Sequence, residues 1–495
     1  MEKIRNSLSY RVVEVTFLAS TISIILLIIA SVFNFYDIRG NESNVIYSIQ
    51  LALKDNALLY QSPESFPFNI SQYAPLYYVV NDCLISLLQI ENTEFYTIRI
   101  LTRLSSIVAL IIALIYLKNI FQSVLKIPNR TSLILCFLFL IVSFPWFNIS
   151  RPDVFVLLFY ILSIYHLLLY CANKTSQKHA VFLGVFLFLG IASKLTMGFY
   201  FIPFGIYFLV IRDYKLALIS SISFLFSLGL FYLLLWLLDY NSTYIIENIL
   251  DGVNNGYNLS KAMTKSYLTF ANYYSVFSIG LILLTIESFI KWKDEREDQT
   301  LVFLITLNVF TIALSFLAAV KVGSAINYFN EALLVMIILT IYLLEKHYKS
   351  YRKLYLIFLM VFGISITLNH SFKYVPNFVE DKNKKHRMAS ELENIVNYLQ
   401  DNLGSNYYYS DNREIAMSLP EKCILFPSDI HNITYQREVY DYTLLEKWVN
   451  RGELKYLIVV PHRKQIYGID IDEKYLLTQK FANYYLYELT SYNNK

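Results

Sequence analysis

Charged residues are scarce in this sequence. Asp, Glu, Lys and Arg make up 16% of the 495 residues, against ~25% in an ordinary soluble domain, while 56% of the residues are hydrophobic. So little charge does not cover a globular surface of this size, which excludes a simple soluble enzyme. A disordered chain needs the opposite balance and is also excluded. The net charge of 42 − 38 = +4, with no basic cluster, argues against a nucleic-acid partner.

Cysteine is also rare. The four cysteines have no spacing typical of metal ligands, so neither a zinc site nor a disulfide framework is expected: Cys83, Cys136, Cys171 and Cys423. Aromatic residues, in contrast, reach 17% and include 42 Tyr. Many of these rings are expected at a membrane–water interface, where an aromatic body with a polar tip is stable.

Long apolar runs dominate the first three quarters of the chain. A membrane-spanning helix needs ~20 apolar residues. The first run follows Lys3, Arg5 and Arg11, and it is predicted to be an uncleaved anchor with a cytoplasmic N-terminus. Eleven spans are predicted in all, of which 180–193 and 196–211 are the weakest: 12–34, 104–122, 131–148, 153–171, 180–193, 196–211, 216–238, 273–290, 301–320, 328–344 and 354–369.

A twelfth apolar stretch, 75–90, is short and contains Asn81 and Asp82. If it does not cross the membrane, five consecutive Lys- and Arg-containing loops face the cytoplasm, as topology rules require. We therefore interpret it as a juxtamembrane helix within one long external loop, 35–103. The odd number of spans then places the C-terminus outside.

The remainder of the chain, 370–495, is polar and has no span. Residues 390–399 are predicted to form a helix and 407–409, 424–426 and 456–460 short strands. The fold class is thus an α-helical polytopic membrane protein, 1–369, followed by a small external α/β domain, 370–495.

Two carboxylates follow the anchor in the first external loop, Asp37 and Glu42. A carboxylate at the water–lipid boundary can act as a general base, because partial desolvation lets it take a proton from a hydroxyl. The alternative is a solvated carboxylate that caps a helix over 43–54, and for either residue alone we favour this alternative.

The same loop ends in a Tyr-rich motif, followed by Arg103 at the start of the next span. The rings of Tyr73 and Tyr77 can stack on a sugar or lie against acyl chains, or they can belong to an ordinary interfacial belt. Arg103 can donate paired hydrogen bonds to a phosphate, or it can extend to lipid headgroups.

Further charges stand at the predicted outer ends of later spans. Arg151 and Asp153 flank Pro152, and Asp153 can be the cap of a helix or part of a polar cavity with Glu42. Lys194 interrupts an apolar hairpin and needs a partner, which can be a phosphate, Asp153 or Glu42.

The clearest single motif runs from Lys321 to Glu331. Asn327, Tyr328 and Glu331 enter the tenth span from the outside, and Asn327 and Glu331 share a helix face at helical spacing. A Glu in the first turn of a span is costly unless it lines a cavity. Carboxylates and cations on one membrane face suit a phosphate-bearing amphiphile, with the cations stabilising the charge on a departing phosphate.

The ordered motifs resemble the GT-C superfold of membrane glycosyltransferases that use polyprenyl-phosphate sugars, in particular relatives of protein O-mannosyltransferases and aminoarabinose transferases. The resemblance lies in the order of the anchor, the acidic loop, Tyr-x-Pro-Leu-Tyr-Tyr, Arg-Leu-Ser, Ser-Arg-Pro-Asp, Ser-Lys-Leu-Thr and Asn-Tyr-Phe-x-Glu. It implies that Glu42 is the catalytic base, that Asp153 is the second carboxylate and that Arg103 lies near the donor phosphate. The family's Asp-Glu pair reads Asn41-Glu42 here, so Asp37 remains a second candidate base.

The predicted function is transfer of a sugar from a polyprenyl-phosphate donor to an envelope glycan, glycolipid or protein, with inversion, on the extracytoplasmic face of a bacterial inner membrane. The predicted substrate-binding residues are Arg103, Arg151, Lys194, Tyr73, Tyr77, Lys321, Asn327, Tyr328 and Glu331. No metal ligands are assigned, and a divalent cation stays open, because carboxylates are present but no His lies among them. Alternatives are a glycan polymerase or ligase with a diphosphate carrier, and a lipid or glycan transporter.

Overall fold

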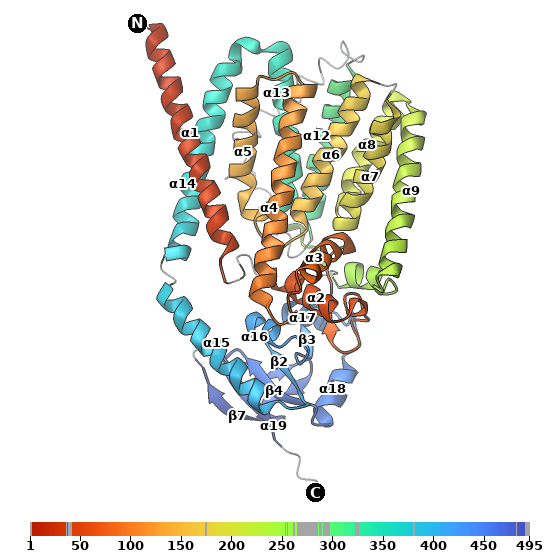
Figure 1. Ribbon diagram of the computed structural model, residues 1–495, viewed down its shortest axis with the longest axis vertical. Coiled ribbons are helices and arrows are strands. Elements are labelled where there is room, and N and C mark those ends of the chain that lie inside the picture. Colours follow the sequence, from red (N-terminus) through yellow and green to blue (C-terminus); the bar gives the residue numbers. More distant parts are fainter. Residues whose placement is uncertain are drawn as a thin grey trace. The chain divides into compact units, whose positions relative to one another are not determined.

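The computed structural model divides the chain into two compact units, drawn as ribbons in Figure 1. Unit 1 comprises residues 1–33, 104–231 and 256–375, and unit 2 comprises residues 34–103, 232–255 and 376–495. The structure describes residues 2–35, 37, 42–173, 176–252, 254, 256–260, 263–264, 286, 290, 298–321, 326–379, 382–481 and 483–490.

Unit 1 is built from apolar helices. The helices that lie in it wholly or in part are α1 (Glu2–Val32), α4 (Phe95–Asn119), η2 (Ile120–Val124), α5 (Asn129–Phe147), α6 (Asp153–Ala172), α7 (Gln177–Ser193), α8 (Met197–Ile211), α9 (Tyr214–Leu237), α12 (Gln299–Ala319), η5 (Ile326–Phe329), α13 (Asn330–His347), η6 (Lys349–Tyr351) and α14 (Arg352–Val379). α6 packs along α7, and α12 packs along α8 and α13, as Figure 1 shows. A Cβ at Gly184 would collide with the carbonyl oxygen of Ser220, so the close approach of α7 to α9 requires glycine at this position.

Eight of the described helical segments are long and apolar enough to cross a membrane: 10–32, 95–124, 129–147, 153–172, 214–237, 299–319, 327–347 and 349–372. The two shorter apolar helices, α7 and α8, coincide with the weakest predicted pair of spans. The predicted span 273–290 lies outside the described residues except at 286 and 290. The prediction of an integral, mainly helical membrane protein is confirmed, while the number of eleven spans stays a prediction.

The first-loop part of unit 2 contains short elements between α1 and α4. They are α2 (Glu42–Lys54), η1 (Asn56–Leu58), β1 (Phe68–Asn69) and α3 (Pro75–Leu87), joined in this unit by η3 (Glu247–Asp251). Pro75 occupies the first turn of α3, where its missing amide hydrogen costs nothing. With 13 residues, α3 is about 20 Å long, too short to cross a membrane, in agreement with a juxtamembrane helix.

The C-terminal part of unit 2 is an α/β arrangement. Its elements are α15 (Lys382–Asn402), β2 (Tyr407–Ser410), α16 (Arg413–Ser418), β3 (Leu425–Phe426), α17 (Ser428–Gln436), α18 (Thr443–Asn450), β4 (Leu454–Val459), β5 (Gln465–Ile466), β6 (Ile469–Asp470), α19 (Ile471–Lys474), β7 (Tyr475–Lys480) and β8 (Tyr485–Leu489). Four strands form a sheet in the order β2-β4-β8-β7, in which only β2 and β4 are parallel. The helix and the three strands predicted in this region are confirmed to within a few residues, except that α15 is longer than predicted.

The first loop and the C-terminal part share one core. β1 pairs in parallel with β3, with Phe68 opposite Leu425. Phe68 and Ile70 are fully buried in the hydrophobic cluster of the C-terminal part. The hydroxyl of the buried Tyr47 in α2 also donates to the carbonyl oxygen of Pro420 at 3.1 Å. The structure therefore groups the first loop with the C-terminal residues, whereas the sequence predicts the loop as part of the transmembrane domain, 1–369.

Candidate active site

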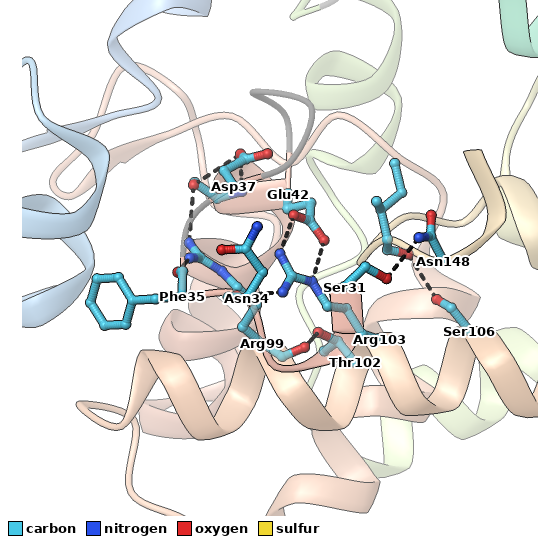
Figure 2. A network of polar contacts seen from close by, with 12 residues as sticks. Ser31, Asn34, Phe35, Asp37, Glu42, Arg99, Thr102, Arg103, Ser106 and Asn148 are labelled. Atoms are coloured by element: carbon cyan, nitrogen blue, oxygen red, sulfur yellow. Dashed lines mark hydrogen bonds and ion pairs between the residues drawn. The ribbon is translucent and has the colours of Figure 1, made fainter. Parts of the chain in front are cut away.

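A buried ion pair lies at the start of α2. Arg103 donates from Nε to Oε1 of Glu42 at 2.8 Å and from Nη2 to Oε2 at 2.6 Å, and neither side chain is exposed to solvent. Figure 2 shows the guanidinium facing the carboxylate. Both oxygens of Glu42 are thus held by one cation, in the paired geometry that Arg forms with carboxylates.

A second arginine lies one helical turn before Arg103. The predicted span starts at residue 104, but α4 begins at Phe95, so Arg99 and Arg103 are both inside the helix on one face. Arg99 donates to the carbonyl oxygen of Phe35, and Arg103 donates to that of Asn34 at 2.6 Å. The two arginines therefore fix the backbone that leads to Asp37 (Figure 2).

Asp37 caps α2. Its Oδ2 accepts hydrogen bonds from the amide of Ser43 at 3.0 Å and from the hydroxyl of the same residue at 3.1 Å. Nη1 of Arg413 lies 3.7 Å from the same oxygen. The structure therefore places Asp37 at the N-terminus of α2, where a carboxylate is stabilised whether or not it also acts as a base. Asn41 lies outside the described residues.

The two candidate tyrosines of the first loop are buried in unit 2. Tyr77 has no exposed surface, and its hydroxyl donates to the carbonyl oxygen of Thr102 at 3.2 Å. Tyr73 is 9% exposed, and its carbonyl oxygen accepts a hydrogen bond from Tyr60. In this arrangement the ring of Tyr77 offers no face for stacking on a sugar, and that of Tyr73 offers little.

A second polar cluster forms in unit 1 around Asp153. Nζ of Lys194 lies 2.9 Å from Oδ1 of Asp153, and Nδ2 of Asn327 donates to the same oxygen at 2.6 Å. Nε of Arg151 is 3.2 Å from Oδ2. We call these four residues the Asp153 cluster; all four are at least nine-tenths buried. Of the partners considered for Lys194, the structure identifies Asp153.

Aromatic rings and a second carboxylate adjoin the Asp153 cluster. Nζ of Lys194 lies 4.8 Å from the ring centroid of Tyr328, within the range of a cation–π interaction. Oε2 of the buried Glu331 accepts a hydrogen bond from the hydroxyl of Tyr200 on α8 at 3.3 Å. Asn327 belongs to the short 3₁₀ turn η5 and Glu331 to the first turn of α13. Asn327 donates to Asp153, whereas Glu331 accepts from Tyr200.

Lys321 adds a further cation near this cluster, between α12 and η5. Burial, together with the weaker repulsion from Lys194, lowers the pKa of the Lys321 ammonium to about 8. The two lysines therefore lie close enough for their charges to interact. A bound anion would relieve this repulsion.

Several contacting residues were not found from the sequence. Tyr200 lies in an apolar helix with no distinguishing pattern, and Arg413 with its neighbour Glu414 lies far along the chain from Asp37.

Within the described ranges, no group of three or more His, Cys, Asp and Glu side chains is arranged to hold a metal ion. The Glu42–Arg103 pair belongs to unit 2 and the Asp153 cluster to unit 1.

Comparisons with known proteins agree on one class. A family model described as dolichyl-phosphate-mannose-protein mannosyltransferase matches residues 85–238. No curated protein matches the sequence. The chain is similar to the solved structure of ArnT from Cupriavidus metallidurans bound to undecaprenyl phosphate, with a TM-score of 0.61 at 9% identity, over 95% of this chain and 98% of that one.

It is also similar to the archaeal oligosaccharyltransferase AglB from Archaeoglobus fulgidus, with a TM-score of 0.54 at 11% identity, over 90% of this chain and 69% of that one. At such identities the likeness to solved structures establishes the fold, and the predicted resemblance to the GT-C superfold is confirmed. With the family match over residues 85–238, the prediction that the chain is a membrane glycosyltransferase of the GT-C type is also confirmed.

Proposed function

We propose that the chain transfers a sugar from a polyprenyl-phosphate donor to an envelope glycan, glycolipid or protein. The transfer takes place on the extracytoplasmic face of a bacterial inner membrane and inverts the anomeric carbon. The concentration of Lys and Arg in the predicted cytoplasmic loops supports this sidedness. The likeness to ArnT with undecaprenyl phosphate, and to AglB with a dolichol-phosphate, supports a lipid-phosphate donor.

The observation that carries the proposal is the charge around Asp153. Arg151, Lys194 and Lys321 bring three cations to a region that also holds the carboxylates of Asp153 and Glu331. Cations gathered at the end of apolar helices suit the phosphate of a membrane-embedded lipid. They stabilise the negative charge that grows on the phosphate as it departs.

The chemical step needs a base for the acceptor hydroxyl. The acceptor oxygen bonds to the anomeric carbon while the bond from that carbon to the phosphate oxygen breaks. The hydroxyl proton passes to a carboxylate, and the electron pair of the broken bond leaves with the lipid phosphate. Attack from the face opposite the phosphate gives inversion, and product analysis that shows retention would contradict it.

We assign the base to Asp37 rather than to Glu42, which the resemblance implied. Protonation of Glu42 would break its paired hydrogen bonds with Arg103 and leave that cation buried without its counter-charge. Asp37 instead accepts from the neutral donors of Ser43, with Arg413 farther away at 3.7 Å. In this assignment Glu42 holds Arg103, and Arg103 with Arg99 holds the segment before Asp37.

Mass spectrometry of envelope glycans from the native host tests the proposal. A deletion strain is complemented with the wild type, Asp37→Asn or the matched control Asp55→Asn, at equal levels of protein in the membrane. Asp55 is an exposed cap in the same unit, whose carboxylate accepts from the amide of Ala57 at 2.9 Å. The side-chain oxygen of an asparagine can accept the same hydrogen bond, so Asp55→Asn should preserve the cap.

We expect the wild type and the Asp55 variant to restore one sugar that the Asp37 variant does not restore. Restoration by Asp37→Asn would remove Asp37 as the base. Identical glycans in the deletion and wild-type strains would contradict the transferase function itself.

A second candidate function is transfer of a preassembled oligosaccharide, favoured by the likeness to the oligosaccharyltransferase AglB. Chain-length analysis of the same glycans separates the two functions. A single added sugar supports the first, and loss of a complete chain supports the second.

A further inference from the structure

We propose that Arg413, supplied by the C-terminal part of the chain, is a positioning residue for the carboxylate of Asp37. The inference rests on the proposed function, in which Asp37 is the base. It assigns the C-terminal part a direct role in transfer, beyond that of an external domain attached to the membrane enzyme.

Arg413 joins two carboxylates. Its Nη1 lies 3.7 Å from Oδ2 of Asp37, and its Nη2 donates to Oδ2 of Asp429 at 3.2 Å. Arg413 is the first residue of α16, whose start is fixed by Asn412, since its side chain accepts from the amide of Ile415 at 3.0 Å. A capped helix on one side and Asp429 on the other therefore hold the guanidinium next to Asp37.

The neighbouring residue, Glu414, contacts Arg99, which binds the backbone just before Asp37. Its Oε1 lies 3.9 Å from Nη2 of Arg99. The same nitrogen of Arg99 is 3.4 Å from the hydroxyl of Ser43, and its Nη1 donates to the carbonyl oxygen of Phe35. The adjacent residues of α16 thus engage both the carboxylate of Asp37 and the arginine that fixes the backbone before it.

Among the described residues, charged groups from three elements lie around Asp37. They are Arg99 on α4, Arg413 and Glu414 on α16, and Asp429 on α17. Burial raises the pKa of the Glu414 carboxyl, while the positive charge of Arg99 opposes this rise. Arg413 makes an ion pair with Asp37 itself, so its removal makes that carboxylate easier to protonate.

This electrostatic effect separates a positioning role from general support of the fold. The test uses full-length protein with Arg413→Gln, the conservative Arg413→Lys, and Arg451→Gln as a matched control. Arg451 is an exposed arginine of the same unit, 3.7 Å from Glu453. The first measurement is hydrogen exchange at the amide of Ser43. The second is the pH–rate profile of sugar transfer in membranes of the native host, which supply donor and acceptor.

We expect Arg413→Gln to raise the rate of hydrogen exchange at the Ser43 amide roughly two- to fivefold. This factor corresponds to the loss of one partly exposed ion pair. The acid limb of the transfer rate should move to higher pH, because the base loses its charge more readily. Arg413→Lys should retain most of both properties, and Arg451→Gln should match the wild type.

Two results overturn the inference alone, with wild-type transfer intact. One is an Arg413→Gln variant with unchanged exchange and an unchanged pH profile. The other is a uniform loss of rate at every pH, which indicates a merely structural role. If wild-type membranes transfer no sugar, that result contradicts both the proposed function and this inference.

Discussion

Arg103 joins the carboxylate of Glu42 to the carbonyl oxygen of Asn34. Two nitrogens of the guanidinium bind the carboxylate at 2.8 and 2.6 Å, and the third binds the carbonyl oxygen at 2.6 Å. Each partner is costly to bury alone, and removal of one leaves the other charge uncompensated. The pair therefore ties the start of α2 to α4, and the third nitrogen of Arg103 ties the backbone at Asn34 to the same helix.

Glu42→Gln should destabilise unit 2. A broken buried ion pair costs about 3–5 kcal/mol, because the remaining charge stays buried. We expect a lower midpoint of thermal unfolding for the detergent-solubilised variant. The double variant Glu42→Leu/Arg103→Met should recover much of the loss, since it buries no charge.

Glu14→Gln serves as the control. Glu14 pairs with Arg130 in unit 1, where the arginine is largely exposed, and such pairs contribute little. Equal losses of stability for Glu42→Gln and Glu14→Gln would contradict the special cost of the buried pair.

Lys194→Gln should weaken binding of undecaprenyl phosphate. A charged hydrogen bond contributes roughly 1.5–3 kcal/mol, so its loss lowers affinity about tenfold or more. Binding to the purified protein is measured by native mass spectrometry. Lys178→Gln, an exposed lysine near the start of α7, is the control and should bind like the wild type. Unchanged affinity of the Lys194 variant would show that the Asp153 cluster is only structural.

Features that depend only on neighbouring residues in the chain could be predicted from the sequence. Apolar runs indicate the spans, and the cost of an unpaired Lys194 in an apolar hairpin led to Asp153 as one of its partners. The helix type at Asn327 differed from the prediction, because the chain forms a 3₁₀ turn there before α13 begins. The start of α4 was also not predicted, because two arginines just before an apolar run look like its boundary. In the structure they lie inside the helix, since Glu42 and two backbone carbonyl oxygens accept their hydrogen bonds.

Contacts between distant segments could not be predicted in this way. β1 contains only Phe68 and Asn69, too few for a recognisable strand pattern, and it forms only by pairing with β3. The approach of Arg413 to Asp37 likewise depends on the packing of unit 2. No periodicity records a contact between residues so far apart in sequence.

Lys321 predicts a pH dependence of donor binding. Burial, with repulsion from Lys194, lowers the pKa of Lys321 to about 8, so the ammonium is charged below that pH and neutral above it. We expect the affinity for undecaprenyl phosphate to fall between about pH 7 and pH 9. Lys321→Arg should remove the fall, because arginine stays charged, and Lys321→Gln should bind weakly at both pH values. A Lys321→Gln variant with the wild-type pH dependence would assign the effect to another group.

His431 predicts a pH dependence of stability in unit 2. Its Nε2 lies 3.0 Å from the carbonyl oxygen of Phe68, so this nitrogen carries the proton of the neutral ring. Nδ1 then accepts from the hydroxyl of Tyr442 at 2.8 Å. Burial lowers the pKa of the imidazole from 6.5 to about 3. The folded state thus needs the neutral ring to join the first loop to the C-terminal part.

The sign follows from this lowered pKa. The unfolded chain binds a proton at His431 between about pH 3 and 6.5, so stability is complete above 6.5 and falls as the pH drops below it. At about 1.4 kcal/mol per pH unit, the loss between pH 6.5 and pH 5 is about 2 kcal/mol. His431→Gln should lower stability at pH 7 and reduce this loss, as measured by the unfolding midpoint across the pH range. The exposed His462→Gln should leave the wild-type profile unchanged, and a wild-type slope in the His431 variant would show that another group causes the acid sensitivity.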